Sequence, residues 1–239
     1  MNSFSIRKAL RLGWEKAFEN FWTLLGFFLA LVATAVLISL LSAILFWAPA
    51  ISELIAFAFQ IVSLFISTLL LMNFLKIARG EKISFDSLID EFGELFSLKK
   101  TGGKNIHLVA NFAVTSLIYG LMVILGLIAL IVPGIYLAIK YSQVVYLLID
   151  KKKTLPDCKG LKLSQALRKI AQSYKEMFAE AGKLMDGVKW RYFGFFFVVF
   201  GLALLSIIPG VLTLGLGFVF FSIMIQTAFA GIYLQLAKK

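Results

Sequence analysis

The sequence predicts an all-α integral membrane protein with six transmembrane helices, arranged as three hairpins that are each preceded by a cytoplasmic amphipathic helix. Of the 239 residues, 60% are hydrophobic and only 15% are charged, whereas a soluble globular protein has about 25% charged residues. Long stretches carry no charge, and the basic residues are concentrated between them. A soluble core of this size cannot bury so much apolar surface, so we expect lipid to cover part of it.

The stretches without Asp, Glu, Lys or Arg locate the predicted spans, because a helix needs about 20 apolar residues to cross a bilayer. Stretches 20–52 and 54–75 hold one span each. Stretches 105–139 and 192–237 are too long for a single span, and we divide both at their Pro-Gly pairs. The predicted spans are 21–47, 54–77, 106–132, 135–149, 192–208 and 211–237.

The distribution of Lys and Arg predicts the orientation of these spans. Apart from Lys140, every Lys and Arg lies in the N-terminal segment, in or beside the loops after the second and fourth spans, or in the C-terminal tail. The opposite connections carry none, so we expect both termini to be cytoplasmic. The net charge of +11 therefore lies on one face of the membrane. No basic module stands apart from the lipid, and we do not expect nucleic-acid binding.

A threefold internal repeat is suggested by matching segments. The residues Ile-Val-Pro-Gly at 131–134 match Ile-Ile-Pro-Gly at 207–210, and Pro49 lies at the equivalent outer turn of the first hairpin. An amphipathic stretch with apolar residues at helical spacing precedes each hairpin. We therefore treat 1–239 as a single membrane domain and divide it into three repeat units. These units are 1–79, 80–154 and 155–239.

The amphipathic stretches differ in charge, because the first and third are basic and the second is acidic. Basic helices gain free energy beside an anionic leaflet, whereas an acidic helix is repelled there. The acidic helix would then pair with basic neighbours, dock a partner, or present a solvated face. Its side-chain spacing is ordinary surface patterning, so we expect no metal site. The predicted cytoplasmic interaction surface consists of Asp86, Asp90, Glu91, Glu94, Arg168 and Lys169.

Lys140 is the one basic residue in the interior of a predicted span, since Lys76 lies at the cytoplasmic end of the second span. A charge at this depth costs roughly 2.5–3.5 kcal/mol on insertion scales and requires a partner or water. Glu53, the one acidic residue on the outer side, has a similar predicted depth, so we hypothesise an ion pair between the two. Alternatively, Lys140 faces a polar cavity and binds an anionic headgroup or solute, with Gln60, Tyr136 and Gln143 among the nearby polar groups.

No catalytic constellation is evident in the sequence. His107 has no Cys or His partner, Cys158 has no evident base, and Gly102-Gly103-Lys104 lacks the remaining residues of a phosphate-binding loop. We therefore expect a protein that is not an enzyme and that carries no cofactor.

The segment 133–142, with Pro133-Gly134 and Lys140, followed by Ala-Leu-Arg-Lys at 166–169, resembles a known family. It is similar to the membrane domain attached to some bacterial glycerophosphoryl diester phosphodiesterases, and to related six-span proteins of unknown function. The resemblance implies a prokaryotic inner-membrane domain with a basic residue at the Lys140 position. It implies no activity, because the phosphodiesterase barrel needs about 250 residues.

These observations leave three functions open. The first is a scaffold or accessory subunit that acts through its basic cytoplasmic face, with a membrane protein or a second copy as partner. The second is a small transporter or channel in which Lys140 faces a polar cavity. The third is lipid binding or handling, with anionic lipids of the cytoplasmic leaflet as ligands.

Overall fold

The computed structural model describes residues 4–44, 47–96, 104–152, 162–213 and 215–237. These residues form helices and connecting turns without a strand. Six helical segments within them are long and apolar enough to cross a membrane. The segments are Ile6–Leu40, Ala50–Arg79, Asn105–Ala129, Ile131–Asp150, Lys189–Leu212 and Leu216–Ala237. The all-α class and the six helices that are long and apolar enough to cross a membrane are thus confirmed. Cys158, Gly102-Gly103 and the repeat boundary at 154–155 lie outside the described residues.

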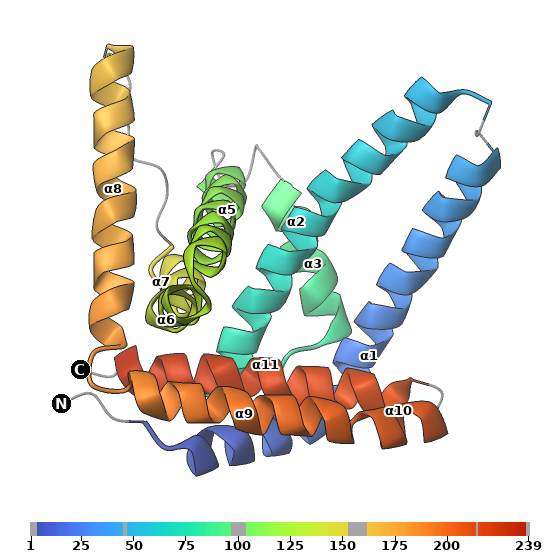
Figure 1. Cartoon of the computed structure of the whole chain (residues 1–239). Coiled ribbons are helices and arrows are strands. Elements are labelled where there is room, and N and C mark those ends of the chain that lie inside the picture. The colour runs from blue at the N-terminus through green and yellow to red at the C-terminus, as the bar shows by residue number, and fades with distance from the viewer. Residues whose placement is uncertain (1–3, 45–46, 97–103, 153–161, 214, 238–239) are drawn as a thin grey trace.

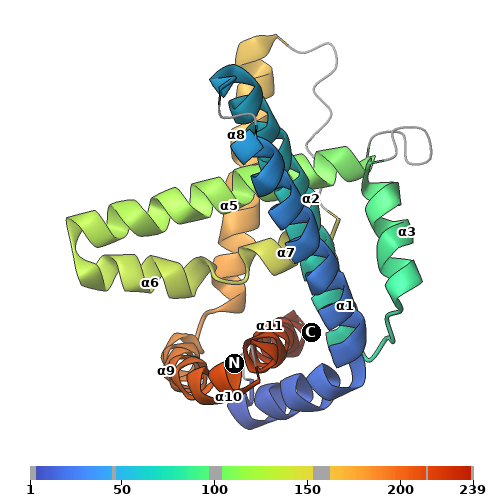
Figure 2. The ribbon, with the colours of Figure 1, turned by 90° about the vertical axis from the view of Figure 1, so that its right-hand side faces the viewer.

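Most of the buried hydrophobic residues belong to one cluster, which we call the hub, and a smaller second cluster includes Tyr192 and Ile232. Figures 1 and 2 show how the helices that form the hub are arranged. At its centre lies the short helix α7 (Val144–Asp150), in which Val144 and Leu148 are fully buried. Around α7 pack α2 (Pro49–Arg79), α5 (Lys104–Ala129), α8 (Leu163–Leu184) and α11 (Leu216–Ala237). The main hub segments are 17–27, 65–77, 88–95, 108–112, 144–149, 177–181 and 223–233.

Antiparallel helices project from the hub as arms that leave it in different directions (Figures 1 and 2). The first arm pairs α1 (Ile6–Ile44) with α2, and the second pairs α5 with α6 (Ile131–Tyr141). The third consists of α9 (Lys189–Leu205) and α10 (Ile207–Leu212) with α11. Large apolar side chains are exposed along all of them, for example Leu54, Ile128 and Leu212. Contiguous exposed apolar surface of this kind suits contact with lipid.

The Pro-Gly pairs do not form the turns that the sequence suggested. The α5–α6 turn lies at Leu130, so Pro133 belongs to the first turn of α6. In the third arm, by contrast, Pro209 lies in α10 before the turn, and α11 begins only at Leu216. Proline is tolerated in the first turn of a helix because its missing N–H has no helical partner there. The two matching motifs therefore occupy different sides of their turns, and the threefold repeat stays a prediction.

Glycine allows the backbones to approach closely beside these turns. A Cβ at Gly126 would lie 2.9 Å from the Cα of Gly134, and a Cβ at Gly217 would lie 2.7 Å from the amide nitrogen of Gly210. Any side chain at Gly126 or Gly217 would force the two helices of the arm apart.

The three predicted amphipathic stretches form helices in different settings. Residues 6–21 are the beginning of α1 rather than a separate helix, and this part lies along α11 (Figure 1). The helix α3 (Phe85–Phe96) packs through the buried Leu88 and Leu95. In α8, the buried residues Met177, Phe178, Ala181 and Gly182 lie in the second half.

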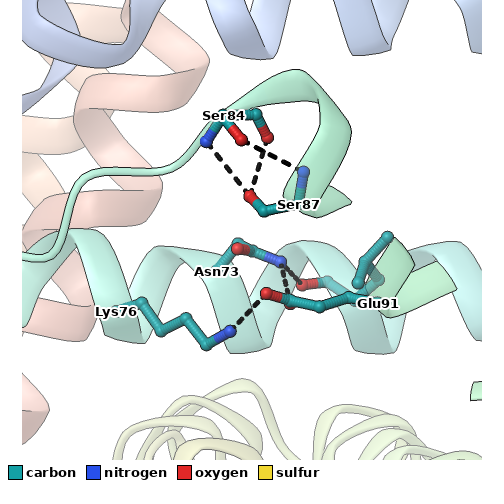
Figure 3. Close-up of polar contacts among 6 residues, drawn as sticks. Asn73, Lys76, Ser84, Ser87 and Glu91 are labelled. Atoms are coloured by element: carbon teal, nitrogen blue, oxygen red, sulfur yellow. Dashed lines mark hydrogen bonds and ion pairs between the residues drawn. The ribbon is translucent and has the colours of Figure 1, made fainter. Parts of the chain in front are cut away.

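A polar contact fixes α3 against α2 (Figure 3). The Nζ of Lys76 lies 2.5 Å from Oε1 of Glu91, and Asn73 donates a 3.1 Å hydrogen bond to Oε2 of the same carboxylate.

At the start of α3, the amides of Ser84 and Ser87 each donate a 3.1 Å hydrogen bond to the other residue's hydroxyl. These bonds satisfy amides that a helix N-terminus leaves without partners.

Candidate functional site

The fourth apolar segment is interrupted beside Lys140. The sequence predicted one continuous span over 135–149, whereas α6 ends at Tyr141 and α7 begins at Val144. At the break, the Ser142 hydroxyl donates a 2.9 Å hydrogen bond to the carbonyl of Ile139. Gln143 is fully buried and donates a 2.7 Å hydrogen bond to the hydroxyl of Tyr192, which ties the break to α9. Interrupted membrane helices often lie at binding sites, because their freed backbone must line a cavity or pack against protein.

Lys140 projects from the end of α6 towards α8. A Cβ at Gly182 of α8 would lie 3.2 Å from the Cε of Lys140, so the absence of a side chain at Gly182 leaves room for the lysine. The Lys140 ammonium lies 5.2 Å from the ring centroid of Tyr141 and 5.9 Å from that of Tyr136, within the range of cation–π attraction. Among the ion pairs of the described residues, none includes Lys140.

A cavity of about 700 Å³ surrounds this lysine, and we call it the lysine pocket. It lies where α5, α6, α8 and the beginning of α9 meet. Its charged lining residues are Lys140, Lys175, Lys183, Lys189 and Asp186. Four lysines and one aspartate therefore line this cavity, so the formal charge of its lining residues is positive.

The remaining polar contacts order the rim of the lysine pocket. The Nζ of Lys189 lies 3.1 Å from Oδ1 of Asp186 and donates a 3.1 Å hydrogen bond to the hydroxyl of Tyr136. The same ammonium lies 5.0 Å from the Tyr136 ring centroid, so Lys140 and Lys189 both approach this one aromatic ring. On α8, Tyr174 donates a 2.6 Å hydrogen bond to Oδ1 of Asn111, and burial raises the pKa of Tyr174 above its ordinary value.

An apolar groove between α6 and α9 continues from the lysine pocket. A cavity of about 510 Å³ shares Tyr136 and Lys189 with the pocket, and its other lining residues are mostly apolar. A further cavity of about 430 Å³ shares Ile135, Ile139 and Phe193 with it. The lining of this last cavity is entirely apolar and consists of Ile135, Ala138, Ile139, Phe193, Phe196, Phe197 and Phe200.

The arrangement is suited to holding a negatively charged group. Each lysine ammonium provides three donors and a full positive charge, and such groups bind phosphate well. Within the described residues, no group of three or more His, Cys, Asp or Glu side chains is placed to hold a metal ion. The chemistry that this site supports is electrostatic binding of an anion.

The structure assembles only part of the predicted ligand site. Tyr136 lies beside Lys140 as expected, whereas Gln143 is buried behind the break and does not line the lysine pocket. Gln60 and Glu53 are exposed on α2, in another arm. The hypothesis of a Glu53–Lys140 ion pair is therefore wrong in this structure. The two residues do not meet because Glu53 lies in the first turns of α2, at the end of the first arm away from the hub, whereas Lys140 lies at the end of α6 next to α7 in the hub (Figure 1).

Of the residues predicted to form a cytoplasmic interaction surface, Glu91 is paired within the protein instead. Asp86, Asp90 and Glu94 are exposed at successive four-residue steps along α3. Glu91 instead faces α2, where it pairs with Lys76 and Asn73, so this carboxylate is not available to a partner. On α8, Arg168 and Lys169 are exposed, and their role in an interaction surface stays a prediction.

Several residues of the lysine pocket were missed by the sequence reasoning. Lys175, Gly182 and Lys183 lie on α8, and Asp186 lies in the turn that follows it, at steps of seven, one and three residues along the chain. That spacing is visible in the sequence, but the helices that pack against these residues are not. Lys189 begins α9 and reaches Tyr136, 53 positions earlier in the chain.

No family model, no curated protein and no solved structure matches this chain. The resemblance of 133–142 and 166–169 to the phosphodiesterase-associated membrane domain therefore stays a prediction.

Proposed function

We propose that this protein is a non-enzymatic multi-pass membrane protein that binds a phosphate-bearing anion in the lysine pocket. The observation that carries this proposal is the concentration of four lysines around one cavity, with a single carboxylate among them. Lys140 belongs to an apolar segment and lacks an ionic partner within the described residues, so a bound anion would supply the missing counter-charge. The shared chemistry is a phosphate group, carried by an anionic lipid or by a soluble compound.

The proposed topology has the arms as transmembrane hairpins and the hub at the cytoplasmic face of a prokaryotic inner membrane. It requires the arms, which leave the hub in different directions in Figures 1 and 2, to align along the membrane normal. The two ends of the described chain support a common side for the termini: the amide of Ser5 donates a 2.9 Å hydrogen bond to Oε1 of Gln235 (Figure 1). Arg191 likewise donates a 3.0 Å hydrogen bond to the carbonyl of Phe4. With the basic face on this side, the lysine pocket is next to a leaflet that is rich in anionic lipid.

The test compares the phosphate-containing molecules that stay bound after purification in a mild neutral detergent. The site variant is Lys140→Ala with Lys175→Ala. The matched control is Lys8→Ala with Lys82→Ala, which removes the same charge from exposed positions. Native mass spectrometry is expected to detect a bound phosphate compound on the wild type and the control, and to find it lost from the site variant. Equal retention by all three proteins would overturn the proposal.

A role as an accessory subunit is a second candidate, favoured by the acidic stripe of Asp86, Asp90 and Glu94. Ile89 is exposed on the same helix, so α3 offers both charge and apolar area to a basic segment of a partner. A photo-crosslinking residue at Ile89 is expected to yield a protein adduct in cells that disappears when the three carboxylates become amides. An adduct that still forms when the three carboxylates are replaced by amides would contradict this role.

A further inference from the structure

We infer that the anion bound in the lysine pocket is the headgroup of an amphiphile whose hydrocarbon chain lies in the apolar groove between α6 and α9. This inference rests on the proposed phosphate site and names the class of its ligand: a phosphate-bearing lipid.

The first support is the continuity of the charged and apolar spaces. Tyr136 and Lys189 line both the lysine pocket and the first cavity of the groove. The hydroxyl of Tyr136 accepts the hydrogen bond from Lys189, while the Tyr136 ring belongs to the apolar side. An aromatic ring with one polar edge is suited to the junction between a headgroup and a chain.

The second support is the composition and length of the groove. Its far cavity has no polar side chain in its lining, so a soluble phosphate compound would gain nothing there. The lining residues of α9 run from Lys189 to Phe200, which corresponds to about 16 Å at 1.5 Å per residue. A medium-length acyl chain matches this extent, and each methylene removed from water adds to affinity.

The third support is the direction of the groove. Its charged end lies where α9 begins at the hub, and its apolar end lies further along the third arm (Figure 1). In the proposed topology, this order places the charge at the membrane surface and the apolar end towards the bilayer centre. A membrane lipid has the same polarity, so it could enter the groove without reversing its orientation.

The test compares two ligands that share a phosphate group and differ in their chain: inorganic phosphate and octyl phosphate. Binding of each to the protein in neutral detergent is measured by calorimetry. The groove variant is Ala138→Trp, which places a large side chain in the far cavity. The matched control is Ala56→Trp, at an exposed position of the first arm. Lys140→Ala with Lys175→Ala reports on the headgroup site.

Octyl phosphate is expected to bind the wild type at least about tenfold more tightly than inorganic phosphate, because the groove buries its chain. Ala138→Trp should abolish this preference and leave the affinity for inorganic phosphate unchanged, while Ala56→Trp keeps both. If the wild type binds the two ligands with equal affinity and the double lysine variant binds neither, the lipid inference is overturned. The proposed phosphate site is then supported. Binding of neither ligand would overturn the proposed function itself. The wild-type comparison decides the inference even where Ala138→Trp does not fold.

Discussion

Gly182 faces the side chain of Lys140 so closely that a Cβ at Gly182 would lie 3.2 Å from the lysine Cε. This contact joins the polar helix α8 to the end of the apolar helix α6. It places a lysine from a candidate membrane span in the same cavity as the lysines of α8. The size of residue 182 therefore controls the position of the Lys140 ammonium, and with it the geometry of the proposed anion site.

Replacing Gly182 by leucine should weaken phosphate binding while the protein still folds. The leucine side chain would displace Lys140 and remove one charged hydrogen-bond donor from the anion. Such a bond contributes about 1.5–3 kcal/mol, so a loss of about tenfold or more in affinity is expected. Calorimetry with octyl phosphate measures it. Gly93→Leu is the control, because a Cβ at Gly93 meets no atom within 4 Å. Unchanged affinity in Gly182→Leu would contradict the assigned position of Lys140.

The buried hydrogen bond between Gln143 and Tyr192 should stabilise the break between α6 and α7. Tyr192→Phe leaves the Gln143 amide without a partner at a site where its Oε1 already has none among the described residues. We expect a loss of about 1–3 kcal/mol in the free energy of unfolding, measured by denaturing-detergent titration.

Adding Gln143→Leu to Tyr192→Phe should recover part of that loss, because both polar partners are then removed. Tyr136→Phe, at a half-exposed residue, serves as the matched control and should change the free energy of unfolding by less than about 0.5 kcal/mol. Additive losses in the double variant would show that the two side chains do not interact.

Asp150 should act as an anchor between α7 and two neighbouring helices. Its carboxylate pairs with the guanidinium of Arg79 and accepts a 2.8 Å hydrogen bond from the hydroxyl of Tyr233. Asp150→Asn keeps the size of the side chain and removes its charge, so a loss of about 1–3 kcal/mol is expected in the same titration. Tyr233→Phe alone should lower the free energy of unfolding by less than Asp150→Asn does. Combining the two substitutions should lower it little beyond Asp150→Asn alone, since that substitution already weakens the hydrogen bond between residues 150 and 233. A neutral Asp150→Asn would rule out the anchor.

Glu91 should contribute to the stability of α3 more than its neighbour Asp90 does. The Glu91 carboxylate contacts Lys76 and Asn73 (Figure 3). Asp90, by contrast, is exposed. Glu91→Ala is expected to lower the free energy of unfolding by about 1 kcal/mol or more, because it leaves buried Asn73 with one fewer partner. Asp90→Ala should stay within about 0.5 kcal/mol of the wild type. Equal effects of the two substitutions would contradict this contact.

The long apolar helices could be predicted from the sequence because bilayer thickness requires uninterrupted apolar stretches, which are bounded here by charges such as Glu19 and Lys104. The extent of α1 could not, because this helix runs through Glu19 from Ile6. Lys140 could be singled out from the sequence because it is a charge inside such an apolar stretch. The break at Ser142-Gln143 carries neither Gly nor Pro, so no local signal indicated it. The contact between Lys140 and Gly182 could not be predicted from the sequence either, because Gly182 lies 42 positions later and the contact depends on how α6 and α8 pack.

The most direct test of a lipid held by both charge and groove is photo-crosslinking in the intact membrane. A photo-reactive residue replaces Phe197 in the groove or Phe57 on the first arm, which are 63% and 61% exposed. Mass spectrometry then identifies the lipid attached to each. Capture at 197 is expected to be enriched in a phosphate-bearing anionic lipid and to lose that enrichment with Lys140→Ala, while capture at 57 stays the same. An identical lipid mixture at 197 with and without Lys140 would contradict the account.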